Sequence, residues 1–134
     1  MLAEPTRGEA ARADRALHPR VTSSGIRKEN SIRVLLKVSL PTERANALFK
    51  DGTFVKKMQS ILQELKPEAA YFAEDGGVRT GYIVVNLQNA SEIPAIAEPF
   101  FLAFNAKVEF HPAMVPEDLM AAGAAIERAV KIYG

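Results

Sequence analysis

Residues 31–40 read SIRVLLKVSL, and this stretch begins the part of the chain that decides the fold. Apolar side chains recur at every second position from Ile32 to Leu40, the period of a strand with one face on a core. A helical stretch, two strands joined by a hairpin, a shorter helix, a fourth strand and a last helix follow. This order of elements predicts one α+β domain over residues 31–134.

The first helical stretch follows Pro41 and is predicted to be broken near Gly52. Thr42 is a candidate N-cap residue, and Asp51 or Thr53 is expected to cap a second helical piece. Glycine inside a helix costs about 1 kcal/mol relative to alanine, which favours a break there. The second piece carries an apolar stripe suited to packing on a sheet, formed by Val55, Met58, Ile61, Leu62 and Leu65.

Three further strands are predicted, over residues 69–74, 78–87 and 106–111. Asp75-Gly76-Gly77 separates the first two and is expected to form a hairpin turn, because glycine accepts a positive φ.

Two more helices complete the pattern. One is predicted over residues 91–104, capped by Ser91 and kinked at Pro99, and a single final helix is predicted from Pro116 onward. The resulting β-α-β-β-α-β order, followed by a C-terminal helix, is the ferredoxin-like plan of one antiparallel sheet with helices on one face.

Composition excludes several classes of protein. The 134 residues suffice for one compact domain, and the net charge of +1 argues against a nucleic-acid-binding protein. No apolar run approaches the roughly 20 residues that span a membrane. The absence of cysteine excludes disulfides, thiolate nucleophiles and cysteine-bound zinc, and it suits a reducing compartment, so we expect a cytoplasmic protein.

Residues 1–30 differ from the rest of the chain. Their large apolar side chains are few: Met1, Leu2, Leu17, Val21 and Ile26. Such a segment buries too little surface to offset the entropy of ordering it, so a disordered leader is predicted. The segment also lacks the apolar stretch of a secretory signal.

The sheet face opposite the helices, here called the outer face, is predicted to mix polar and apolar side chains. In the first strand it carries Leu35 between charged residues, and in the third strand it carries Tyr82 and Val84. A solvated face is one interpretation, but large apolar members favour an interface, so we expect a homodimer that pairs its sheets.

Candidate site residues follow from chemistry and position. His111 is the only histidine beyond the leader and is a candidate general base or heme ligand, with Glu109 on the same face. Glu98 and Tyr82 are further candidates for catalysis. Candidates for binding an anionic or polar ligand are Arg33, Arg79, Asn86 and Glu109.

The alternative for each candidate is a purely structural role. His111 and Glu109 supply too few ligands for a metal, so no metal site is predicted. No phosphate-binding or dinucleotide-binding glycine motif occurs, so no cofactor is predicted.

The segments NALFKDGTF (46–54), KPEAAYF (66–72), RTGYIVVNL (79–87) and EIPAIAEPFFLAFNAKVEFHPAMVPEDL (92–119) resemble an uncharacterised family of small bacterial proteins. The wider superfamily consists of dimeric α/β-barrel, ferredoxin-like proteins. It includes antibiotic-biosynthesis monooxygenases, muconolactone isomerases and heme-degrading enzymes. The resemblance implies the fold and a dimer, and it transfers no catalytic residue.

Three functions are compatible with these observations. The first is a homodimer that holds a small organic ligand without catalysis. The second is a cofactor-independent oxygenase or isomerase that works in a cleft between sheet and helices. The third is heme handling with His111 as ligand. An apolar pocket of several hundred Å³ with convergent polar groups would favour an enzyme.

Overall fold

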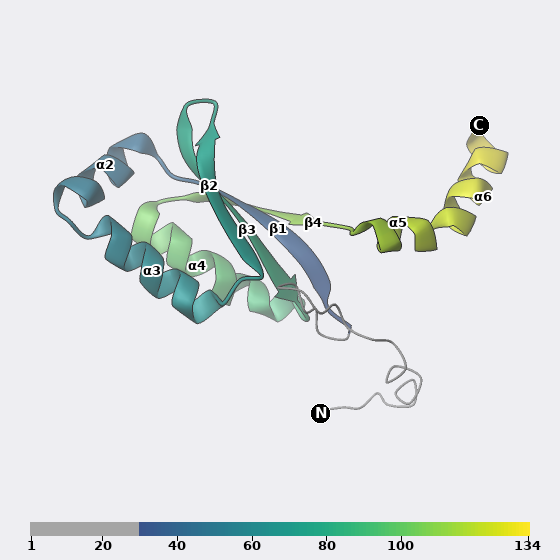
Figure 1. The fold of residues 1–134 in the computed structure, drawn as a ribbon, viewed down its shortest axis with the longest axis horizontal. Helices are drawn as coiled ribbons and strands as arrows, with labels where there is room; N and C mark the ends of the chain where they lie inside the picture. Colours follow the sequence, from purple (N-terminus) through teal and green to yellow (C-terminus); the bar gives the residue numbers. More distant parts are fainter. Residues whose placement is uncertain (1–29) are drawn as a thin grey trace.

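The computed structural model describes residues 30–134, so the predicted leader lies, apart from Asn30, outside the described residues. Figure 1 shows one sheet with helices packed on one of its faces and a helical arm that extends from its end. The elements in chain order are β1 (Ile32–Ser39), α2 (Thr42–Lys50), α3 (Phe54–Leu65), β2 (Ala69–Asp75), β3 (Val78–Leu87), the 3₁₀ turn η1 (Ala90–Glu92), α4 (Ile93–Phe104), β4 (Lys107–Pro112), α5 (Pro116–Ala121) and α6 (Gly123–Tyr133).

The four strands form an antiparallel sheet in the order β2-β3-β1-β4. This order confirms the ferredoxin-like α+β plan, with β1 in the interior of the sheet. The strand predicted from residues 31–40 is thus hydrogen-bonded on both sides, to β3 and to β4.

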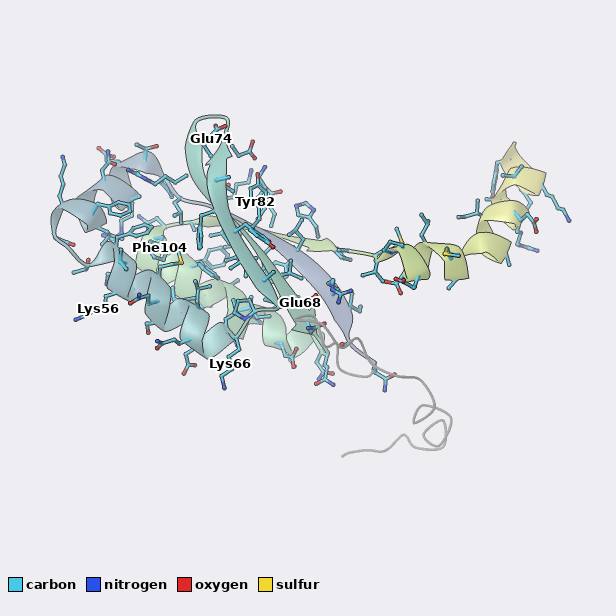
Figure 2. The ribbon with its side chains drawn as sticks, viewed as in Figure 1. Lys56, Lys66, Glu68, Glu74, Tyr82 and Phe104 are labelled. Atoms are coloured by element: carbon cyan, nitrogen blue, oxygen red, sulfur yellow. The ribbon has the colours of Figure 1, made fainter. Side chains whose placement is uncertain are left out.

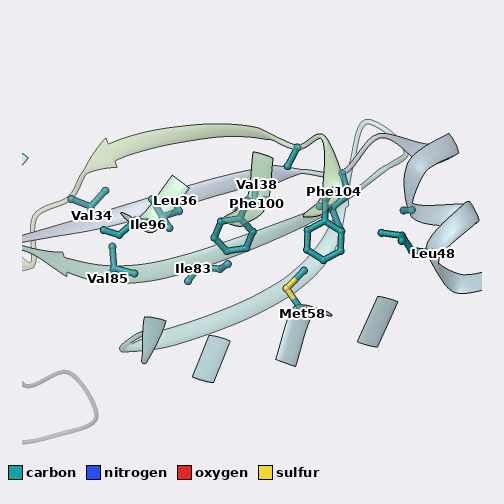
Figure 3. Packing of buried hydrophobic residues seen from close by; sticks show 13 residues of the cluster. Val34, Leu36, Val38, Leu48, Met58, Ile83, Val85, Ile96, Phe100 and Phe104 are labelled. Carbon is teal, nitrogen blue, oxygen red and sulfur yellow. The ribbon is translucent and has the colours of Figure 1, made fainter. Parts of the chain in front are cut away.

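The core lies between the sheet and the helices α3 and α4, as Figure 3 shows. The side chains of Leu36, Ile83, Phe100 and Phe104 are fully buried there. Met58 contributes from α3, while the predicted stripe residue Val55 is 56% exposed and does not join the core. Burial of each large apolar side chain contributes about 1.5–3 kcal/mol, so this cluster supplies most of the driving force for folding.

The predicted break at Gly52 is confirmed. Gly52 has a φ of +80°. The helix α2 ends before it at Lys50, and α3 begins after it at Phe54. Asp51 Oδ1 accepts hydrogen bonds from the backbone N–H of Thr53 at 2.9 Å and from its hydroxyl at 2.6 Å. The prediction that Thr42 caps the first helix is wrong, because Pro41 occupies the N-cap position of α2 and no side chain caps this helix.

The hairpin between β2 and β3 also forms as predicted. Gly76 and Gly77 have φ +63° and +83°, the pair of positive values that a two-residue type I′ turn requires. Glu74 Oε1 accepts a hydrogen bond from the backbone N–H of Gly77 at 2.8 Å and holds the turn.

The start of α4 and the end of the chain depart from expectation. Ser91 does not cap α4, because residues 90–92 form the 3₁₀ turn and Glu92 is the N-cap. The helix continues through Pro99 to Phe104. The prediction of a single final helix is wrong, because the segment divides into α5 and α6 at Ala122. The ψ of Ala122 is close to zero, and the next residue is a glycine, which has a low helix propensity.

Candidate functional site

The outer face of the sheet carries the candidate residues from three strands. The register places Lys37 of β1 opposite Tyr82 of β3 and Glu109 of β4, and it places Leu35 opposite Val84 and His111. Side chains that pair in this way lie on the same face of a sheet. The predicted composition of the outer face is therefore confirmed for these residues.

An apolar patch lies in the middle of this face. Leu35, Tyr82 and Val84 are each half-buried, and Tyr71, which pairs with Tyr82 across β2 and β3, is 69% exposed. Among the described residues, the helices that pack on the sheet cover the opposite face (Figure 1). The patch is thus available for contact.

An ion pair borders the patch on the side of the hairpin. The ammonium group of Lys37 pairs with the carboxylate of Asp75. The hydrogen bond between Lys37 and Asp75 and the attraction between their charges raise the pKa of Lys37 and lower the pKa of Asp75. Tyr82 also donates a hydrogen bond that lowers the pKa of Asp75. The three residues form one polar network.

A second polar group lies on the other side of Lys37. Glu109 Oε1 is 3.1 Å from His111 Nε2, and Glu109 Oε2 is 3.4 Å from Lys107 Nζ. The hydrogen bond from His111 is the main cause that lowers the pKa of Glu109, and Lys107 contributes less. Glu109 is therefore a carboxylate at neutral pH, placed to orient the imidazole of His111.

Arg33 and Glu68 form an ion pair that is better shielded from solvent than the ion pairs of Lys37 and Glu109. Arg33 Nε donates to Glu68 Oε1 at 2.9 Å and to Oε2 at 3.2 Å, and the two side chains are 9% and 15% exposed. Figure 2 labels Glu68 where the chain enters β2. Arg33, predicted as a ligand-binding residue, thus has a structural partner.

Asn86 pairs with Arg33 in the register of β3 and β1. Its side-chain oxygen Oδ1 is buried and has no hydrogen-bond partner within the part of the chain that the structure describes. An unsatisfied buried acceptor costs about 1–3 kcal/mol, so a donor from a ligand or a partner chain would be stabilising there.

A cleft of about 770 Å³ opens between α3, α4 and the end of β3. Half of its lining residues are apolar, and the polar ones are Ser60, Glu64, Lys66, Asn86, Gln88 and Glu92. Glu92 Oε1 already accepts a hydrogen bond from the backbone N–H of Gln88 at 2.9 Å. The cleft has the size expected of a small-molecule site.

Two candidates lie apart from these groups. Arg79 packs over the ring of Phe49 at 5.0 Å, at the opposite end of the sheet from Arg33, so the two arginines do not converge on one anion. Glu98 is exposed on α4 rather than buried among apolar side chains.

Sequence reasoning did not identify Asp75 and Glu68 as members of the site. The sequence predicts Asp75 in a turn, and Glu68 lies between two predicted elements. No local signal marks either residue, because their partners Lys37 and Arg33 are 38 and 35 residues away along the chain.

Residues 30–134 contain no group of three histidine or carboxylate side chains positioned to hold a metal ion. None of the helices in this range is long and apolar enough to cross a membrane.

No family model, curated protein or solved structure matches this chain. Of the resemblance described above, the structure shows the four-stranded antiparallel α+β sheet.

Proposed function

We propose that the protein is a homodimer that pairs its outer sheet faces and binds a small organic ligand between them. The observation that carries this proposal is the apolar patch of Leu35, Tyr82 and Val84 at the centre of a sheet face that helices leave open. Antiparallel sheets with a solvated face alternate apolar and polar residues cleanly, and this face does not.

The polar groups beside the patch support a ligand site rather than a dry interface. Lys37 lies between Asp75 and Glu109, and it would remain paired when a second sheet excludes water. Charges that lose water must keep their partners, and these charges already have them. The ligand that fits is a small organic molecule with an apolar body and a hydroxyl or carboxyl group.

Light scattering tests the dimer. We expect at least twice the 14.6 kDa mass of one chain at micromolar concentration. Leu35→Arg places a charge in the patch and should lower the mass by separating the paired sheets, while the matched change Ile32→Arg, at a 53% exposed position on the other face of β1, should leave the mass unchanged. A wild-type monomer at these concentrations would refute the proposal.

A cofactor-independent oxygenase or isomerase is the second candidate, favoured by the contact between His111 and Glu109. When the Nε2–H of His111 donates a hydrogen bond to Glu109, Nδ1 keeps the lone pair that accepts a proton from a carbon acid. Glu109 then stabilises the imidazolium that results.

Oxygen uptake with dihydroxyaromatic compounds, and deuterium uptake from solvent into unsaturated lactones, test this second candidate. An enzyme of this kind loses turnover in His111→Gln while its stability changes by at most about 1 kcal/mol. If the wild type turns over none of these compounds, the binding function stands and the enzyme is excluded for these two reactions.

A further inference from the structure

The C-terminal arm, residues 116–133 of α5 and α6, extends away from the sheet and from α3 and α4, as Figure 1 shows. Within the described structure α5 packs against α6. The arm exposes large apolar side chains to solvent, where they are unfavourable: Leu119, Met120, Ile126, Val130, Ile132 and Tyr133.

Three of these side chains form one stripe. Ile126, Val130 and Tyr133 are spaced by four and three residues and lie on one face of α6, while Glu127, Arg128 and Lys131 lie on the other. Helices shorter than about 12–15 residues are marginal in water without packing, and α6 has 11 residues. The arm therefore needs a surface to pack on.

A groove of matching character runs between α3 and α4. The cleft of about 770 Å³ is joined by a second hollow of about 460 Å³, and both are lined by Ser60, Ile61 and Pro99. Leu102 lines the second hollow and is 75% exposed. The groove follows α3, whose 12 residues span about 18 Å, and α6 is about as long.

The charges along the groove complement the charges along the arm in one of the two possible orientations of the arm. One end of the groove carries Lys56 and Lys57, and the other carries Glu64 and Glu92 together with Lys66. Figure 2 labels Lys56 and Lys66 near opposite ends of α3.

The arm begins with two carboxylates in α5 and ends with a net positive charge in α6. The acidic start comes from Glu117 and Asp118, and Arg128 and Lys131 outweigh Glu127 near the end. The favourable orientation thus places α5 beside the lysines of the groove and α6 beside its glutamates.

The arm of the same copy would enter the groove from the end that carries the glutamates, which is the unfavourable orientation. The backbone N–H of Ala113 donates to the carbonyl of Arg33, and β1 and β3 pair Ile32 with Leu87, so the arm starts at the end of the sheet where β3 leads to Glu92. Folding back would place the acidic α5 at the acidic end of the groove.

We propose that the arm of one copy lies in the α3–α4 groove of a second copy, with α5 at the lysine end. The groove and the arm belong to the same chain, so two copies can exchange arms in a symmetric dimer. The contact uses a surface different from the outer sheet face and goes beyond the function proposed above.

Disulfide trapping tests the contact and its direction, because the full chain has no cysteine. A Leu102→Cys protein mixed with a Leu119→Cys protein should form a cross-linked heterodimer under mild oxidation. The matched mixture of Ala95→Cys, at the glutamate end, with Leu119→Cys should not, since cysteine Cα atoms more than about 7 Å apart cannot be bridged.

Three outcomes would overturn the proposal. Cross-linking that favours Ala95→Cys reverses the direction, and a disulfide found only within a Leu102→Cys/Leu119→Cys chain shows that the arm folds back. No cross-link in any mixture would show that the arm of a second copy does not lie in the groove. The Leu35→Arg background keeps the result separate from the sheet dimer, because trapping should persist there.

Association measured by sedimentation supplies a second test. Val130→Asp, on the stripe, should weaken association of the Leu35→Arg protein at least about tenfold. Ile132→Asp, at a 54% exposed position on the opposite side of α6, should leave it within about twofold. Equal effects of the two changes would contradict a specific contact of the stripe.

Discussion

Lys37 of β1 forms an ion pair with Asp75 of β2 across the intervening strand β3. The register places Lys37 level with Tyr82 and Tyr71 rather than with Asp75, which is four residues further along β2 than Tyr71. The β2–β3 hairpin must therefore curl over the outer face for the pair to form.

Arg33 and Glu68 span β3 in the same way at the other end of the face. The two ion pairs enclose the apolar patch around Leu35 and Val84. Together they set the outline of the surface proposed to pair with a second copy.

The first prediction concerns Asp75→Asn and pH. The ion pair lowers the pKa of Asp75 from 3.8 and raises that of Lys37 from 10.5. The lowered pKa of Asp75 contributes stability above its unfolded value that is lost as the pH falls through the folded value. The raised pKa of Lys37 contributes stability below its unfolded value that is lost as the pH rises through the folded value.

The difference in Tm between wild type and Asp75→Asn should therefore be largest between about pH 4 and pH 10 and shrink on both sides. Thermal unfolding followed by circular dichroism across this range is the measurement. A difference that stays constant down to pH 2 would show that the pair does not form.

The second prediction concerns the shielded pair of Arg33 and Glu68. Arg33→Met leaves the Glu68 carboxylate without this partner in a site that is 15% exposed, and it should cost about 3 kcal/mol of unfolding free energy. Arg33→Met with Glu68→Met should recover most of this loss, because paired apolar side chains replace buried ion pairs well. The double-mutant cycle compares the wild type, the single variants Arg33→Met and Glu68→Met, and the double variant by urea unfolding. Additive losses of unfolding free energy would argue against the pair.

The third prediction concerns Gly52. Alanine at φ +80° is strained although space is open around Gly52, so Gly52→Ala should destabilise the protein by about 1–2 kcal/mol. Gly123→Ala is the matched control: it lies in α6 with open space and no positive φ, and it should be neutral or slightly stabilising. Chemical denaturation distinguishes the two, and a stabilising Gly52→Ala would contradict the observed turn.

The fourth prediction concerns two neighbouring phenylalanines of α4. Phe100 is fully buried and Phe101 is 39% exposed. Phe100→Ala should cost about 3–5 kcal/mol through lost burial and the cavity left behind. Phe101→Ala should cost less than about 1 kcal/mol. Similar losses in urea unfolding would mean that α4 is rotated relative to the structure.

Local features made most of the fold predictable. The alternation from Ile32 to Leu40 indicated a strand with one face on the core, and Gly52 marked the break between α2 and α3. The paired glycines of the hairpin are also readable, because a positive φ depends on the residue itself. Helix starts were less predictable, since Thr42 and Ser91 have capping side chains but do not cap the helices observed.

The candidate site was predictable only in part. Leu35, Tyr82, Val84, Glu109 and His111 lie on the face that alternation assigned to them. Arg79 illustrates the limit, because its place over the ring of Phe49 depends on the position of α2 above the sheet.

The sequence by itself determined the order of strands and helices, the core face of β1 and the chemistry available on the outer face. These follow from periodicity and from residues that act within a few positions. Only the tertiary structure decided that Lys37 meets Asp75, that Arg33 meets Glu68 and that the C-terminal arm leaves its apolar stripe exposed. Each of these depends on segments far apart along the chain, whose distances in space arise from the packing of the sheet and helices.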